Sequence, residues 1–227
     1  MDKQSKITSI YKDEGTREVL DTALKLRRER FWAIIFILIA VLATGIFGTL
    51  KNPFTNTFSK VGNYYGYRGL YIIWAITISF CLHTASFLLF KLTHYNKKWG
   101  YWALTMASFF LIITAIIPSI KEELFFLHVL HKWTTFFFVM SLVAALHPFF
   151  IWLGRKIPRL KILLRNWQLL IFTGSMTSLI IQGQTGIFEL WFFLGLGTLL
   201  IYLCWILFTE KIEEAEKNEQ ITEQERN

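Results

Sequence analysis

Charged residues are missing from six long stretches of this chain, each about 20 residues long. An α-helix needs about 20 apolar residues to cross the ~30 Å hydrocarbon core of a bilayer. A soluble domain has no reason to exclude charge over that length six times, so the pattern argues against an ordinary soluble protein. The charge-free stretches are residues 31–50, 69–90, 99–120, 133–154, 166–188 and 190–209.

Cysteine is also scarce. Cys81 and Cys204 both lie inside charge-free stretches, and neither belongs to a C-x-x-C pair. This spacing argues against a disulfide framework and a cysteine-based metal site, and we expect both thiols to be small buried apolar groups. A small-residue cleavage site is missing after the first stretch, which begins only after residue 30, so we expect that stretch to remain as the first span.

The 227 residues are 54% hydrophobic and 18% charged, which leaves little chain for a soluble domain. We therefore predict an all-α integral membrane bundle of six transmembrane helices. Residues 1–30 form a basic tail with a short juxtamembrane helix, residues 31–209 the membrane domain, and residues 210–227 a charged tail.

The distribution of Lys and Arg predicts the orientation of the bundle. Nineteen of the 24 stand in residues 1–30, 91–98, 155–165 and 211–227, and only five in residues 51–68 and 121–132. Because the side richer in Lys and Arg is normally cytoplasmic, both termini are predicted to lie inside, in a cell membrane. All nine Trp stand near predicted span ends, where indoles favour the interface.

The net charge of +8 sits in short juxtamembrane segments, where it attracts anionic headgroups. No folded basic face is evident, so nucleic acid is excluded as a partner. Membrane lipids are the expected partners, and a homo-oligomer or a membrane protein partner remains open. Small residues at helical spacing predict tight packing faces, within the chain or between copies. They are Ala40, Thr44 and Gly48; Ala103 and Ala107; and Gly174 and Ser178.

Two histidines lie inside predicted spans. His83 and His147 are each seven residues from a cytoplasmic span end, so both rings lie at about the same depth. That arrangement allows bis-histidine haem ligation across the bundle. The competing interpretation is a neutral ring that bonds Ser79 or Ser86, or a carbonyl freed by Pro148. We favour the second interpretation and expect no cofactor.

A second group of polar residues lies at the outer end. His128 and His131 share one helix face, and Glu189 opens the last span at a similar height. Together with Asn52, Ser59 and Gln182 they predict an outward-facing polar mouth that binds lipid or a partner without catalysis. As the alternative, His128, His131, Ser59 and Glu189 provide the residue types of a lipid-directed hydrolase or a zinc site.

Two further functions remain open in the sequence. A small transporter is the third interpretation, although the central thirds of the spans contain no ionisable residue of the kind that ion coupling requires. A haem-binding redox protein that uses His83 and His147 is the fourth.

The chain resembles the bacterial membrane family known as domain of unknown function 998, which is similar to the eukaryotic DRAM-like group. The first external loop carries the resemblance with Asn52-Pro53-Phe54 and Phe58-Ser59-Lys60-Val61-Gly62. Further features are Pro118, His128 or His131, residues 136–138 and Ala144. The resemblance implies a six-helix membrane bundle and no established reaction. Lys60 stands where that family commonly has an acid, so an acid-dependent role does not transfer.

Overall fold

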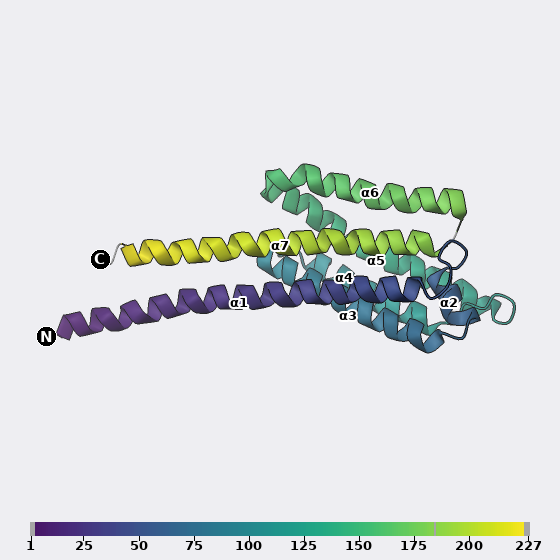
Figure 1. The fold of residues 1–227 in the computed structure, drawn as a ribbon, viewed down its shortest axis with the longest axis horizontal. Coiled ribbons are helices and arrows are strands. Elements are labelled where there is room, and N and C mark those ends of the chain that lie inside the picture. The colour runs from purple at the N-terminus through teal and green to yellow at the C-terminus, as the bar shows by residue number, and fades with distance from the viewer. Residues whose placement is uncertain (1–2, 184, 225–227) are drawn as a thin grey trace.

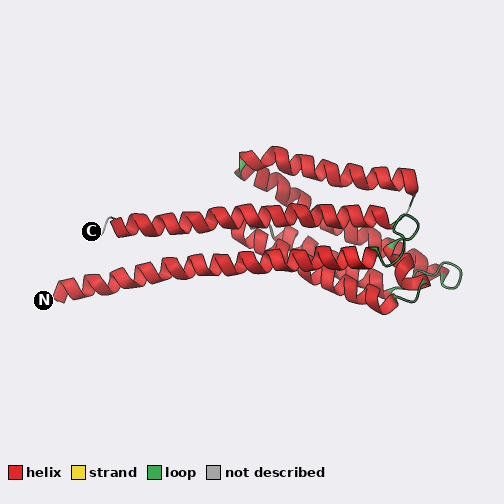
Figure 2. Ribbon diagram, in the orientation of Figure 1, coloured by secondary structure: helices red, strands yellow, loops and turns green. Residues whose placement is uncertain are grey.

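The computed structural model describes residues 3–183 and 185–224, and it contains seven helices and no strand among them (Figures 1 and 2). Six of the helices are long, and the short α2 lies between α1 and α3. The elements are α1 (Lys3–Gly48), α2 (Phe58–Tyr64), α3 (Arg68–Thr93), α4 (Lys98–Ile116), α5 (Phe125–Lys156), α6 (Pro158–Gln182) and α7 (Gly186–Gln224).

Local sequence explains where several helices end. Pro118 follows α4, and Ile117 before it takes the extended ψ of 122° that a proline imposes on its predecessor. Pro158 occupies the start of α6, where its missing N–H costs nothing, and only Ile157 separates α6 from α5. His94 closes α3 in the left-handed region with φ 58°, and Tyr95 N–H donates to Phe90 O across the end.

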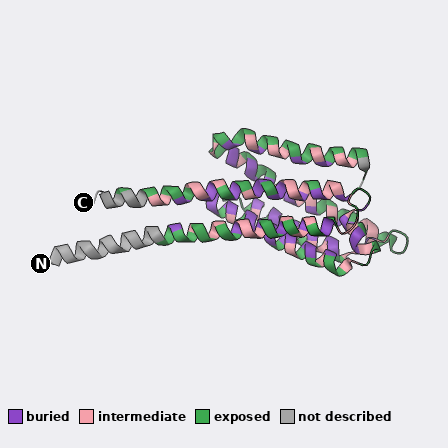
Figure 3. Ribbon diagram, viewed as in Figure 1, coloured by how far each residue is buried: buried purple, intermediate pink, exposed green. Residues whose placement is uncertain are grey.

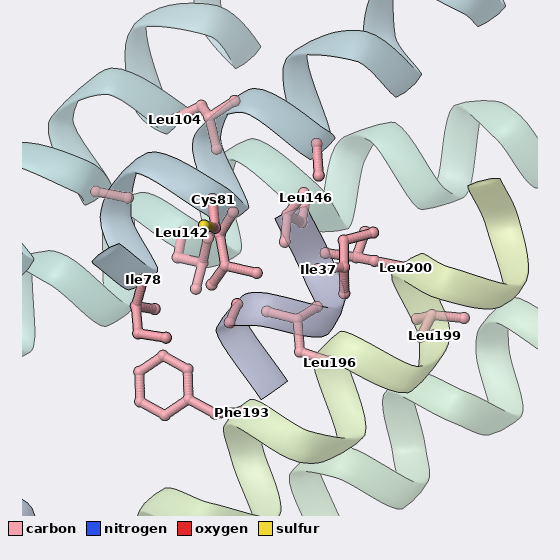
Figure 4. Packing of buried hydrophobic residues seen from close by; sticks show 14 of the residues in the cluster. Ile37, Ile78, Cys81, Leu104, Leu142, Leu146, Phe193, Leu196, Leu199 and Leu200 are labelled. Carbon is pink, nitrogen blue, oxygen red and sulfur yellow. The ribbon is translucent and has the colours of Figure 1, made fainter. Parts of the chain in front are cut away.

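The six long helices form a closed ring in the order α1, α3, α4, α5, α6, α7, and α7 returns to pack along α1 and α3. Inward-facing residues from all six long helices and from α2 build one hydrophobic core (Figures 3 and 4). Figure 4 shows Ile37 of α1 close to Leu146 of α5 and Leu200 of α7. The core therefore joins both ends of the chain to its middle.

Large apolar side chains also cover the outside of the bundle. Exposed fractions reach 82% at Ile180, 74% at Ile181 and 65% at Trp102. A soluble monomer rarely exposes so much contiguous apolar surface, whereas a lipid-facing surface requires it. Five helices are long and apolar enough to cross a membrane, namely α1, α3, α4, α5 and α7. The chain is thus an all-α bundle with several helices suited to a membrane.

Helix α6 differs from the predicted fifth span. It begins with Arg159, Lys161 and Arg165 and continues through several Ser, Thr and Gly residues, and it is not among the five apolar helices. It also ends at Gln182, so residues 186–188 belong to α7 and not to the fifth stretch. Glu189 consequently lies in the first turn of α7, not between two spans.

The two terminal tails continue the helices that precede or follow them. Helix α1 is continuous from Lys3, and α7 continues to Gln224, so both extend side by side beyond the other helices (Figure 1). Arg27 Nη2 lies 2.5 Å from Glu216 Oε1, and Arg30 donates to Thr209 Oγ1 at 3.0 Å. Arg30 also lies 5.3 Å from the ring centre of Trp205. These contacts pair the two extensions with each other.

The small-residue faces pack within the chain. In α1, Thr44 accepts a long hydrogen bond of 3.4 Å from the Trp74 indole, and a Cβ at Gly48 would lie 2.6 Å from Leu190. In α6, a Cβ at Gly174 would overlap the Trp191 indole, which donates to Leu170 O at 3.2 Å. The predicted faces thus serve helix packing inside one molecule.

We expect Gly174→Ala to destabilise the protein, because the added methyl must displace Trp191 from its hydrogen bond. Overpacking of this kind costs about 1–3 kcal/mol. The measurement is the thermal midpoint of unfolding in detergent. Gly45→Ala is the matched control, because nothing lies within 4 Å of its added methyl and alanine favours the helix. A Gly174→Ala midpoint equal to that of Gly45→Ala would show that Trp191 does not constrain α6.

Candidate functional site

Most of the predicted site residues gather at one end of the bundle, which we call the cap. It consists of residues 49–67 and 117–124, residues 183 and 185, and the first turn of α7 at residues 186–189. These are the connections after α1, α4 and α6 as far as they are described, together with α2 and the start of α7. In Figure 1 these connections lie at the end of the molecule opposite the two termini. The cap is therefore a distinct polar layer over the apolar helices.

Asn52 folds the start of the first external loop. Its side-chain Oδ1 accepts from Phe54 N–H at 3.0 Å, and its carbonyl accepts from Asn56 N–H at 3.2 Å. This Asx-type turn is the usual local role of asparagine in loops. The Lys51 ammonium lies 5.0 Å from the Tyr65 ring and 5.8 Å from the Tyr67 ring, so the end of the loop packs over its beginning.

Ser59 belongs to the cap of α2 and not to a histidine pair. Thr57 is the N-cap residue, and its hydroxyl accepts from Lys60 N–H at 3.1 Å. The Ser59 hydroxyl lies 3.1 Å from the Thr57 hydroxyl. The predicted combination of Ser59 with His128 or His131 is thus replaced by a local capping role.

Glu189 holds the first external loop against the last helix. Its carboxylate accepts from Phe58 N–H, the first donor of α2, at 2.5 Å. Ile187 N–H donates to Pro53 O at 3.1 Å, and a Cβ at Gly186 would lie 2.5 Å from Asn56 O. A buried N–H that loses its acceptor costs about 1–3 kcal/mol. Because a Cβ at position 186 would overlap Asn56 O, glycine is required there for the two backbones to approach this closely.

A cluster of aromatic rings fills the space beneath this contact. Phe58 of α2 packs edge-on against Trp74 at 5.1 Å and against Phe47 at 5.6 Å between ring centres. Tyr71 stacks on Trp74 at 5.7 Å, and Phe193 of α7 meets Trp74 at 5.4 Å. The residues of the predicted polar mouth thus lie directly over packed aromatic rings.

The two outer histidines bond the connection between α4 and α5. His131 is 5% exposed, and its Nδ1 lies 3.1 Å from Ile117 O. A carbonyl only accepts, so Nδ1 carries the proton. His128 Nδ1 lies 2.9 Å from the Ser119 hydroxyl. The sequence did not indicate Ser119 as the partner of His128, because only the bend at Pro118 brings Ser119 back to α5.

The contact between Ser119 and His128 has the distance of a nucleophile and its base. Glu122, the carboxylate nearest to Ser119 in sequence, instead accepts from the Tyr64 hydroxyl at 2.7 Å and forms no hydrogen bond to the imidazole among the described residues. Ser119 is only 7% exposed. This arrangement fits a structural hydrogen bond better than the hydrolase interpretation.

Helix α2 joins two segments of the cap, namely the loop after α1 and the connection between α4 and α5. The Tyr64 hydroxyl accepts from Lys121 N–H at 3.1 Å while it donates to Glu122. Hydrogen bonding to Glu122 raises the pKa of Tyr64, and the same bond lowers the pKa of Glu122. Arg68 donates to Asn63 Oδ1 at 2.5 Å and to Ile116 O. Tyr64 and Arg68 thus link α2, whose first N–H bonds to Glu189, with the connection between α4 and α5 that the two histidines contact.

The cap contains no evident metal centre. Within residues 3–183 and 185–224, no group of three or more His, Cys, Asp or Glu is placed to hold a metal ion. The zinc interpretation therefore finds no ligand set in the part of the chain that is described. Gln182 is the last residue of α6, and its side chain lies outside the described residues.

His83 and His147 belong to two different helix interfaces. His83 Nδ1 lies 3.2 Å from the Ser108 hydroxyl of α4, and Ser79 donates to Ser108 O at 3.2 Å. His147 Nδ1 lies 2.5 Å from Gln168 Oε1 of α6. Haem ligation requires both rings to face one cavity, whereas these rings bond to different neighbours. The partner of His83 is Ser108, which the sequence did not indicate.

We expect Glu189→Ala to loosen the first external loop, since Phe58 N–H loses its acceptor at a cost of about 1–3 kcal/mol. Tryptic cleavage at Lys60 of the purified protein should accelerate about tenfold, because cleavage follows the open population. Glu123→Ala removes an exposed carboxylate of the same cap and should leave cleavage unchanged. Equal rates for the two variants would show that Glu189 does not hold the loop.

We expect Tyr64→Phe to reduce hydrogen-exchange protection of residues 117–124, whereas Tyr67→Phe should leave it unchanged. The lowered pKa of Glu122 means that its contribution is present above its ordinary pKa and is lost as pH falls through the lowered value. The raised pKa of Tyr64 means that its contribution is lost only as pH rises through that raised value. Wild-type protection should therefore stay constant from pH 7 to 9, a range above the ordinary pKa of histidine, because His128 and His131 also contact this segment. A fall within that range would contradict this assignment.

The cap is a preformed surface whose predicted residues bond mainly to the protein itself. No model of a protein family, no curated protein and no solved structure matches this chain.

Proposed function

We propose that the chain is a membrane protein with six spans and both termini in the cytoplasm. In this proposal it acts by binding at its outward-facing cap, without catalysis. The cap carries the proposal, since it is a rigid polar layer over helices whose outer surfaces are apolar. Membrane lipids or a membrane protein partner are the proposed ligands. The cell membrane of a bacterium is the proposed location.

The path of α6 supports a sixth crossing. It starts one residue after α5, at the end opposite the cap, and α7 begins at the cap with Ile187 bonded to Pro53. The 25 residues of α6 extend about 37 Å at 1.5 Å per residue, more than the ~30 Å of a hydrocarbon core. Its small residues allow close packing against α7, as Gly174 shows beneath Trp191.

The charge distribution supports the orientation. The cap end carries the five Lys and Arg at positions 51, 60, 68, 121 and 132, and the other end carries the remaining 18 Lys and Arg of the described residues. The positive-inside rule therefore directs the cap outward. Aromatic side chains stand exposed around the cap, among them Phe54 at 56%, Phe125 at 65% and Phe126 at 75%. Such rings favour the interface between lipid and water, and they offer contact area to a partner.

The resemblance to the domain of unknown function 998 is consistent with this proposal. Its loop residues Asn52, Phe58 and Gly62 perform structural roles here: Asn52 turns the loop, Phe58 fills the aromatic cluster and Gly62 admits Tyr71. A Cβ at Gly62 would lie 2.7 Å from Tyr71 Cβ. The family assignment remains a proposal.

Site-directed labelling tests the orientation and the number of spans. The background is Cys81→Ala with Cys204→Ala, since both native thiols are buried. A membrane-impermeant maleimide applied to intact cells should label Lys60→Cys and Glu123→Cys in the cap. It should label Asn96→Cys and Lys161→Cys only after the cells are opened.

Two results would contradict the proposal. Labelling of Lys161→Cys in intact cells would show that the connection between α5 and α6 is outside, against six spans with both termini inside. Turnover of lipid esters by the purified protein, lost in both Ser119→Ala and His128→Ala, would replace binding by catalysis.

A further inference from the structure

Helices α5, α6 and α7 enclose an apolar groove that opens to the outside of the bundle and lies away from the cap. The groove is shallow, with a volume of about 40 Å³. The apolar lining includes Leu146 and Phe150 of α5, Ile171 and Phe172 of α6, and Phe192 and Leu196 of α7. This lining has the apolar chemistry to bind a hydrocarbon chain that lies along the outside of the bundle.

One polar pair interrupts this apolar lining. Gln168 Nε2 donates to Leu164 O at 3.2 Å, which leaves its Oε1 to accept from His147 Nδ1 at 2.5 Å. The His147 side chain is exposed, and its Nε2 has no hydrogen-bond partner among the described residues. A polar group on a lipid-facing surface is costly unless a ligand satisfies it. Nε2 is thus available to a group outside the chain.

Two cationic side chains lie on α6 between this pair and the cytoplasmic end. Arg165 and Lys161 precede Gln168 by three and seven residues, so all three share one face of α6. Both cations are exposed and form no ion pair within residues 3–183 and 185–224. Nearby cations are engaged, because Arg159 pairs with Glu210 and Lys156 donates to Thr93 O.

The spacing along α6 matches the layers of one lipid leaflet. Arg165 lies about 4.5 Å below Gln168 at 1.5 Å per residue. The interfacial zone between hydrocarbon and water is about 5–7 Å thick on each side of a bilayer. A phosphate at Arg165 and Lys161 therefore places the ester groups near His147 and Gln168, with the acyl chain in the groove. The chain from 155 to 188 contains five Lys and Arg and no acid, which favours an anionic lipid.

We propose that the groove between α5, α6 and α7 binds one anionic phospholipid of the cytoplasmic leaflet. Arg165 and Lys161 bind its phosphate, His147 and Gln168 lie at the level of its ester groups, and the apolar lining holds an acyl chain. This inference depends on the six-span orientation proposed above and concerns the end of the bundle opposite the cap.

Native mass spectrometry of the detergent-purified full chain tests the site, with added dioleoyl phosphatidylglycerol and dioleoyl phosphatidylcholine as probes. The wild type should retain one phosphatidylglycerol in preference to phosphatidylcholine. Lys161→Gln with Arg165→Gln should weaken phosphatidylglycerol binding about 30-fold, since each cation contributes roughly 1 kcal/mol to an anionic headgroup. Binding of phosphatidylcholine should change little.

Lys97→Gln with Lys98→Gln is the matched control, because both residues are exposed cations at the same end but lie at the start of α4. It should keep the wild-type preference. Val143→Trp fills the groove and should reduce binding of both lipids. Equal loss in the two charge variants, or a preference retained in Lys161→Gln with Arg165→Gln, would overturn the site. A second copy of the chain in the groove, seen as a dimer without lipid, would also overturn it.

The failure of this site is distinguishable from the failure of the proposed orientation. If the site is wrong, the labelling pattern of the cap and of Lys161→Cys persists while lipid preference is absent. If the orientation is wrong, the labelling pattern reverses while the groove and its cations still select lipid in detergent.

Discussion

The contact between the residues that follow α1 and the start of α7 fixes the arrangement of the last two helices. Glu189 and Phe58 are separated by 131 residues, yet the carboxylate caps α2 directly. The contact fixes the start of α7 at the cap end, beside α1 and α3. Because α5 ends at the opposite end, α6 must cover the whole length between them with one connecting residue before it and three after it. The closed ring of helices and the path of α6 both follow from this contact.

The same constraint explains why the cap and the groove have different chemistry. At the cap, loops from three parts of the chain converge, and their side chains satisfy one another through Glu189, Tyr64, Arg68 and the two histidines. A group already bonded within the protein stabilises the surface and leaves little unmet hydrogen-bonding capacity for a ligand. At the groove, His147 of α5 has an Nε2 without a hydrogen-bond partner, and Lys161 and Arg165 of α6 form no ion pair, among the described residues. The cap is therefore suited to recognition by shape, and the groove to a ligand that supplies polar atoms.

Aromatic packing makes the cap rigid. Phe58 reaches from α2 into a cluster with Phe47, Trp74 and Phe193, so rings from the first external loop and three long helices meet in one place. Edge-on and stacked pairs add about 0.5–1.5 kcal/mol each beyond their buried area. Movement of the loop would expose these rings as well as Phe58 N–H. The loop and the bundle are thus held together by the same rings.

The sequence by itself determined the helices and their approximate ends, because charge exclusion, Pro118, Pro158 and small-residue spacing act locally along the chain. It also indicated that His128, His131 and Glu189 lie at one end, since depth depends only on distance from a helix end. The fifth predicted stretch was placed less well: Gln182 and Gly183 end α6 before residue 186, and the polar content of α6 places it outside the five apolar helices.

Only the tertiary structure decided the partners: Glu189 with Phe58, Ser119 with His128, His83 with Ser108, and His147 with Gln168. Each pair depends on how far a helix is rotated about its axis and on which helix lies beside it. A pattern of apolar residues leaves both undetermined when lipid covers the outside and apolar side chains fill the inside.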